Sequence, residues 1–410
     1  MIFQNNIIQF SERVLMNLLK TILLQMSSVT KAQRKFLVVV LSGLMCLRGK
    51  ANFRNLSRYS DYHEKTYSRG FRREFDFVKF NQLSLSQISN SGNTLVAAVD
   101  CSFISKSGKQ TYGLDKFYNS KQGKAEKGLE ISTLAVVDVT YNTAYNLSTR
   151  QTTVLTNPDE TRVDQYLAHL RQDRVALPES ISYLVADGFY SKTKFINGVT
   201  ALELDLIAKL RHDANLRWLY QGSQKPCGRH KLYDGKVSFD DLTRFELADE
   251  IAGVKLYTAI VNSAHFKRDL RIVYLVKHVG NKVQTALLFS TDLELAAKDI
   301  YLFYKARFQI EFLFRDAKQF TGLSDCQARC RKALHFHFNC AMTALNLIKL
   351  EDRQQNFNTK RKAISIASWK IRKANAHILE RFSSILGLDF SFIKSTPEFE
   401  TLCNYGTITM

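Results

Sequence analysis

The first 85 residues place apolar side chains at the spacing of amphipathic helices. Residues 14–24 and 31–47 each gather their apolar positions on one face, which predicts two helices. Residues 51–60 and 64–73 predict two shorter helices joined by a tight turn. Two short helices around such a turn are the outline of a helix-turn-helix. We therefore expect an all-helical N-terminal domain over residues 1–88.

Beyond residue 93 the pattern changes to short apolar runs that are typical of buried strands. Residues 95–99 and 181–186 are the clearest of these runs. Further strand-like runs cover residues 110–118, 129–139, 204–210, 255–261, 271–278 and 284–290. From residue 293 to about residue 350 the spacing is helical again. This order predicts an α/β domain over residues 89–350, β-rich at about 202–290, and a basic helical tail over 351–410.

The net charge of the chain indicates which kinds of molecule it binds. The chain has 410 residues and a net charge of +20, from 58 Lys and Arg against 38 Asp and Glu. Such a balance favours a polyanion, which means DNA, RNA or an acidic membrane surface. The longest apolar run, 37–47, is too short to span a bilayer, so we expect no membrane partner. Seven scattered cysteines, an odd number, indicate a reduced, intracellular protein without a disulfide framework.

Positive charge is concentrated around the predicted helix-turn-helix. Residues 48–73 contain eight Lys or Arg and two Asp or Glu. Arg69, Arg72 and Arg73 lie in and after the second short helix, where they would contact DNA. The alternative is a basic, solvated face on a helical bundle.

Two acids follow the clearest strands. Asp100 comes directly after the run 95–99, and Asp187 comes directly after the run 181–186. Active sites of α/β folds commonly lie at strand ends, and a carboxylate there is costly to bury unless it is paired or binds a metal. Alternatively, each acid merely caps its strand.

A helix around Tyr304 carries a third acid. Tyr304, Arg307, Glu311 and Lys318 are offset by 0, 3, 7 and 14 residues, so they share one helical face, and Arg315 at offset 11 joins it. An acid flanked by phosphate-binding cations suits phosphodiester chemistry. A ladder of salt bridges from Glu311 to Arg307 and Arg315 is the competing interpretation.

These residues together resemble a known family. The pattern Y-x2-R-x3-E-x6-K, filled by Tyr304, Arg307, Glu311 and Lys318, resembles the signature of DDE transposases in the bacterial group named after insertion sequence four. Asp100 after its apolar run and Asp187 within Val-Ala-Asp-Gly-Phe-Tyr extend the resemblance, which covers roughly residues 90–350.

The resemblance implies an RNase H-like catalytic core, a mixed sheet flanked by helices, with the stretch 202–290 as a β-rich insertion. It implies that Asp100, Asp187 and Glu311 hold two Mg²⁺ ions, which Mn²⁺ would replace, for hydrolysis and strand transfer at the element ends. Tyr304, Arg307, Arg315 and Lys318 would contact DNA phosphates, and Trp218 would stack on a flipped base, unless it is a core residue.

The implied partners are double-stranded DNA, at terminal inverted repeats and at the target, and a second copy of the chain on that DNA. The implied location is the bacterial cytoplasm, at the nucleoid. Three other functions remain open: a related metal nuclease, an inactive transposase-derived DNA-binding protein, and an RNA-binding protein.

Overall fold

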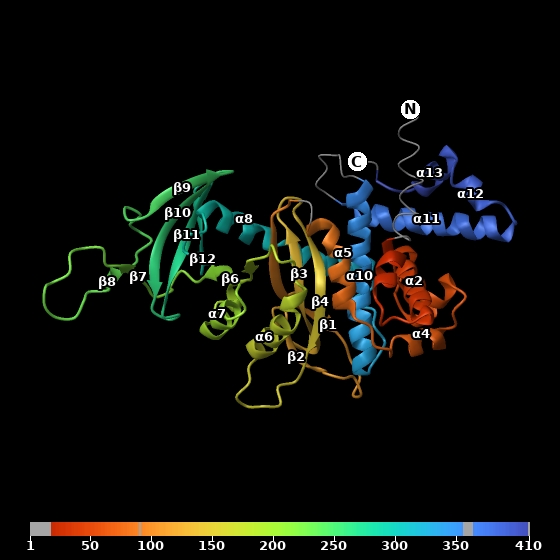
Figure 1. Cartoon of the computed structure of the whole chain (residues 1–410), viewed down its shortest axis with the longest axis horizontal. Helices are drawn as coiled ribbons and strands as arrows, with labels where there is room; N and C mark the ends of the chain where they lie inside the picture. Colours follow the sequence, from red (N-terminus) through yellow and green to blue (C-terminus); the bar gives the residue numbers. More distant parts are fainter. Residues whose placement is uncertain (1–17, 90–91, 356–363, 409–410) are drawn as a thin grey trace.

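The computed structural model describes residues 18–89, 92–355 and 364–408. A central sheet lies between a β-rich end and a helical end, and α10 (Arg331–Gln355) stands between the sheet and the N-terminal helices (Figure 1). The N-terminal and C-terminal helices lie at the same end of the molecule, beside α10 (Figure 1). No helix among these residues is long and apolar enough to cross a membrane.

Helices cover both ends of the described chain. Residues 18–25 are helical, although the first part of the predicted helix 14–24 lies outside the described residues. The next helices are α2 (Lys31–Cys46), α3 (Phe53–Leu56), α4 (Glu64–Gly70), α5 (Phe77–Ser89), α6 (Arg162–Asp173) and α7 (Thr193–Thr200). The later helices are α8 (Ala297–Arg307), α9 (Gln309–Phe320), α10, α11 (Ile366–Ile385), α12 (Phe390–Ile393) and α13 (Pro397–Cys403).

Within the described residues, twelve strands form one mixed sheet, as the sequence predicted for a sheet flanked by helices. The strands are β1 (Leu95–Ser105), β2 (Asp115–Asn119), β3 (Lys124–Asp138), β4 (Thr143–Thr152), β5 (Tyr183–Val185) and β6 (Asp205–Leu210). They continue with β7 (Leu216–Leu219), β8 (Tyr233–Lys236), β9 (Glu246–Ile251), β10 (Val254–Ser263), β11 (Arg268–Val279) and β12 (Lys282–Ser290). The main path runs β2-β3-β1-β5-β6-β12-β11-β10-β7-β8, with β4 beside β3 and β9 beside β10.

The sheet has two parts that meet at one strand pair. β1 pairs antiparallel with β3 and parallel with β5, and β5 pairs parallel with β6. β12 pairs antiparallel with β6 and so joins the β-rich stretch 202–290 to the edge of the central strands. The β-rich stretch therefore extends the central sheet.

Several predicted boundaries were wrong. The strand predicted at 95–99 runs on to Ser105, because every residue of β1 pairs with β3. The strand predicted at 110–118 begins only at Asp115. The single helical stretch predicted from 293 to 350 is divided into α8, α9 and α10.

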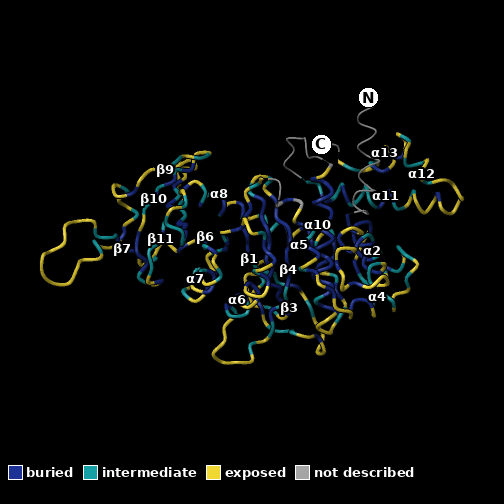
Figure 2. The backbone as a smooth tube through the Cα atoms, viewed as in Figure 1, coloured by how far each residue is buried: buried dark blue, intermediate teal, exposed yellow. Residues whose placement is uncertain are grey.

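β4 is an edge strand that the sequence pattern missed, because most of its residues are polar. On the edge that faces no other strand, backbone N–H and carbonyl groups of β4 form hydrogen bonds with asparagine side chains of α10. Asn346 accepts from the backbone N–H of Asn146 at 2.8 Å and donates to its carbonyl at 2.7 Å. Asn339 makes the same two contacts with Thr149, at 3.1 and 2.8 Å. These side chains take the place of a neighbouring strand at Asn146 and Thr149, and most of β4 is buried (Figure 2).

Each face of the central sheet has its own core. On one face, Leu37 of α2, Phe80 of α5 and Leu345 of α10 belong to one apolar cluster with Val96 of β1 and Ile310 of α9. On the other face, α6 and α7 pack against alternate residues of the same strands. The N-terminal helices thus share a core with the sheet.

Candidate active site

Asp100 lies inside β1, not directly after a strand as the sequence predicted. Its side chain accepts a hydrogen bond from the backbone N–H of Cys101 at 2.8 Å. Side chains alternate along a strand, so Asp100 extends the face of Val96 and Ala98, whose cluster includes α9. The fold therefore directs Asp100 toward the side of the sheet that α9 covers.

Asp187 lies two residues beyond the neighbouring strand β5. Ala98 pairs with Val185 in the parallel register, so the same register places Asp100 level with Asp187. The Asp187 side chain accepts from the N–H of Phe189 at 2.9 Å and begins a short 3-10 helix, Gly188–Tyr190. The two acids therefore stand side by side where β5 ends.

Glu311 comes from α9, just after a break in the helix. α8 ends at Arg307 and α9 starts at Gln309, and the half-exposed Phe308 between them has φ −58° and ψ −18°. Arg307 Nη2 donates to Glu311 Oε1 at 2.9 Å across this break. This pair is one half of the salt-bridge ladder that competed with a catalytic interpretation.

The three acids influence one another. Burial raises the pKa of Asp100 to about 7, and the negative charges of Asp187 and Glu311 add to the rise. The N–H of Cys101 and the charge of Arg307 oppose it. Acids from β1, from the turn after β5 and from α9 thus form one region of excess negative charge, in which Arg307 is the cation that lowers the pKa of Asp100.

The donor set suits a hard divalent cation, because all three acids offer carboxylate oxygens. Burial and the charges of the other two acids raise the pKa of Asp100, and a bound cation would lower it. Among the residues that the structure describes, however, no three His, Cys, Asp or Glu side chains are gathered closely enough to hold a metal ion. Glu311 is held by Arg307, so it has to leave this partner to complete a set of ligands.

Arg307 is the cation best placed to meet a phosphate. Its guanidinium lies 5.5 Å from the centre of the Tyr304 ring, and its side chain is mostly buried. Its buried Nε has no hydrogen-bond partner among the described residues. Because this Nε is buried, it could donate to a phosphate oxygen only after the side chain moved.

The other two cations of the predicted helical face behave differently from each other. Lys318 Nζ donates to the carbonyl of Phe103 on β1 at 2.9 Å, and burial lowers its pKa to about 8. Arg315 pairs with Asp316 at 2.8 Å and its side chain is 60% exposed. Lys318 therefore ties α9 to β1 near Asp100, whereas Arg315 does not form the predicted pair with Glu311.

Sequence reasoning missed the contacts that surround the two aspartates. Tyr190 OH lies 3.3 Å from Cys101 Sγ, so the turn after Asp187 touches the residue after Asp100. Phe189 is 48% exposed beside Asp187, and Lys192 covers its ring at 3.9 Å. The motif around Asp187 contains these aromatic residues, but only the fold shows which one is buried.

Trp218 lies in the core on β7, as the alternative interpretation held. It is 8% exposed and packs against Phe245, with ring centroids 5.1 Å apart. The Arg244 guanidinium lies 4.4 Å from its ring centre. A DNA base could stack on this ring only after Arg244 moved away.

Short helices occupy the predicted helix-turn-helix. α3 continues into a 3-10 turn, Ser57–Tyr59, and α4 follows as far as Gly70, so the second helix is shorter than predicted. Tyr67 is buried between the two, with its hydroxyl 2.7 Å from Ser60 Oγ. The predicted DNA contacts, Arg69, Arg72 and Arg73, are all exposed.

Comparison with known proteins adds a family to this geometry. The sequence matches the family described as DDE superfamily endonuclease over residues 23–254, more than half of the chain. That stretch includes Asp100 and Asp187 and ends before α8. No curated protein matches the chain. Among solved structures, it is similar to the piggyBac transposase synaptic complex with hairpin DNA, with a TM-score of 0.43 and 8% identity, over 97% of this chain and 84% of that chain.

Proposed function

Because the chain belongs to the DDE superfamily of endonucleases, we propose that it is a DNA transposase that cuts and rejoins phosphodiester bonds at the ends of a mobile element. The observation that supports this proposal is that the register of β1 and β5 places Asp187 level with Asp100, while the charges of Asp187 and Glu311 add to the rise that burial causes in the pKa of Asp100. We further propose that the element is an insertion sequence of the group to which the signature at Tyr304, Arg307, Glu311 and Lys318 points, and that the central strands are an RNase H-like core.

DDE endonucleases generally use divalent metal ions, and we propose Mg²⁺, in two sites, for this chain. Asp100 would hold it from the middle of β1 and Asp187 from the turn after β5, and Glu311 would join them once Arg307 releases it. Metal bound there would activate a water molecule or a DNA 3′-hydroxyl and stabilise the leaving oxygen.

The chain's own cations would position the DNA. Arg307, released from Glu311, would present its guanidinium to the phosphate beside the cut, next to the ring of Tyr304. Lys318 would hold α9 against β1 so that Glu311 stays opposite Asp100. The exposed Arg69, Arg72, Arg73 and Arg315 would contact phosphates farther from the cut. Two copies of the chain would act together, one at each end of the element.

The decisive test is cleavage of DNA that carries the gene's flanking ends, in Mg²⁺ and in Mn²⁺, by the wild type and by Asp187→Asn. Asp187→Asn keeps the size of the side chain and removes its charge. Cuts at the ends by the wild type alone would support both the transposase and this ligand. Binding without cutting in either metal would instead indicate a DNA-binding protein that descends from a transposase.

A further inference from the structure

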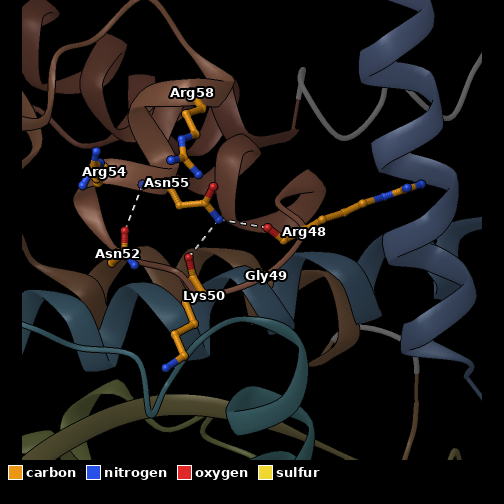
Figure 3. Close-up of a pocket in the computed structure, with 7 residues that line it drawn as sticks. All are labelled: Arg48, Gly49, Lys50, Asn52, Arg54, Asn55 and Arg58. Carbon is orange, nitrogen blue, oxygen red and sulfur yellow. Dashed lines mark hydrogen bonds between the residues drawn. The ribbon is translucent and has the colours of Figure 1, made fainter.

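A basic pocket of about 410 Å³ opens at the start of α3, remote in sequence from the three acids (Figure 3). It is lined by Arg48, Gly49, Lys50, Asn52, Arg54, Asn55 and Arg58. All of them lie in the basic stretch 48–73 of the predicted helix-turn-helix, but none is among the three arginines named there as DNA contacts.

The four cations of this pocket lack acidic partners. Among the residues that the structure describes, no ion pair joins Arg48, Lys50, Arg54 or Arg58 to a carboxylate, and all four are exposed. Exposed cations elsewhere, such as Lys35 and Arg69, also lack an ion pair among the described residues, so what sets these four apart is that they line one pocket. Like charges gathered around one pocket repel each other, so a bound anion would stabilise them.

The cations are spread along the pocket rather than directed at one point. In Figure 3, Arg58 points toward Asn55, Lys50 leaves on the opposite side, and Arg48 stretches to α11. There, Arg48 Nη2 donates to Asn375 Oδ1 at 3.1 Å. A small anion would meet only part of this set, whereas a DNA strand carries a charge about every 3.4 Å along its axis and can meet the cations in succession.

The pocket is also held in a fixed shape. Asn55 Nδ2 donates to the carbonyls of Arg48 and Lys50, at 2.9 and 3.0 Å. The N–H of Ala51 donates to Asp325 Oδ2 at 2.8 Å, in the segment that follows α9. The backbone of the pocket is thereby tied to the helix that carries Glu311, so a phosphate held here has a defined position relative to α9.

We infer that this pocket binds successive backbone phosphates of duplex DNA and sets the position of the duplex relative to α9. The inference rests on the proposed function, and it assigns Lys50, Arg54 and Arg58 a sequence-independent contact. Asn55 is the residue that holds the pocket in shape.

The test is the salt dependence of DNA binding by the full chain, measured by fluorescence anisotropy with a chelator present so that no cleavage occurs. The double variant Arg54→Gln/Arg58→Gln should bind more weakly to every duplex, whatever its sequence. Its slope of log affinity against log salt should be smaller by about two, since each lost phosphate contact removes about one. A slope equal to that of the wild type would overturn the inference.

The matched control is Arg211→Gln, which removes an exposed arginine that already has an acidic partner, and its slope should equal that of the wild type. A second measurement uses the wild type alone, in case the double variant does not fold. Bound DNA should protect Lys50 from acetylation while leaving the exposed Lys332, which pairs with Glu74, reactive. An unprotected Lys50 would overturn the inference.

Free phosphate is the competing ligand. If millimolar inorganic phosphate at constant ionic strength protected Lys50 from acetylation but did not weaken DNA binding by the wild type, the pocket would be a site for a single anion, and the inference would fail. The proposed function fails separately. If the wild type binds DNA through this pocket but never cuts it, the proposed function fails and the inference about the pocket holds. If the chain cuts DNA and the double variant keeps the salt slope of the wild type, only the inference about the pocket fails.

Discussion

Arg307 Nη2 donates to Oε1 of Glu311 at 2.9 Å across the break between α8 and α9. Arg307 also lowers the pKa of Asp100, so one guanidinium opposes the charge of acids from two different elements. The two residues are four apart, the spacing that also pairs side chains on an uninterrupted helix, and here the pair forms across the break at Phe308. In this structure Arg307 is therefore paired with Glu311, one of the three acids proposed to bind a metal ion.

Arg307→Gln should reduce DNA cleavage by about 100-fold, the cost of losing one donor to a developing charge in an active site. Metal affinity should fall much less, since the substitution frees Glu311. Single-turnover cleavage and metal titration would measure the two effects. Arg211→Gln is the control, because Arg211 is exposed and paired with Asp213, and it should change the rate less than about threefold. Equal losses in both variants would contradict this role for Arg307.

Tyr190→Phe should slow cleavage without weakening DNA binding. The substitution removes only the hydroxyl that lies 3.3 Å from Cys101 Sγ and so loosens the link between the turn of Asp187 and the strand of Asp100. A lost hydrogen bond of about 1 kcal/mol corresponds to roughly fivefold in rate. Cleavage rate and affinity would be measured side by side, with Tyr118→Phe as the control, because Tyr118 is 63% exposed. An effect on affinity alone would show that Tyr190 does not position the acids.

Lys349 should make stability depend on pH. Burial lowers the pKa of this lysine from 10.5 to about 8, and its Nζ donates to the carbonyl of Ala144 at 2.9 Å. Between pH 8 and pH 10.5 the unfolded chain therefore binds more protons at Lys349 than the folded chain does, so its contribution to stability rises with pH. Relative to Lys349→Met, the wild type should gain unfolding free energy across that window.

Urea unfolding of both proteins on either side of the window would measure this gain. Lys35→Met, at an exposed position of α2, controls for the removal of one positive charge. A difference between wild type and Lys349→Met that stays constant with pH would refute the prediction.

Trp218→Ala should lower the free energy of unfolding by roughly 3 kcal/mol, as expected for an aromatic ring removed from a core. The ring is 8% exposed, against Phe245 and beneath Arg244. Phe308→Ala is the comparison, because Phe308 is 47% exposed and its loss should cost less than about 1 kcal/mol. If Trp218→Ala were as stable as the wild type yet defective in cleavage, the ring would act on DNA and not in the core.

Apolar patterning predicted the parts of the fold that bury apolar side chains. The helix at 31–47 and most of the strands follow from local sequence, since their burial depends on side chains that the pattern reveals. β4 could not be predicted in this way, because its burial depends on Asn339 and Asn346 some 200 residues away. The end of β1 likewise depends on its partner strand and not on its own apolar run.

The sequence predicted which elements bring the acids, but not how the cations around them pair. The order Asp100, Asp187, Glu311 places one acid on each of three neighbouring elements. Arg307 and Arg315 each lie four residues from Glu311, so helical periodicity predicts that both can pair with it. Only Arg307 does so. Arg315 pairs with Asp316 instead, and helical spacing does not reveal that competition.

The common core of α2, α5, α9, α10 and β1 has a consequence for how this chain can be divided. A fragment that began at β1 would leave the apolar face of α10 bare, so it would report on misfolding and not on a missing DNA contact. The preference for particular ends must therefore be mapped by exchanging surface side chains within the intact chain. Exposed residues of the N-terminal helices can vary without disturbing this core, while their inner residues are constrained together with the central sheet.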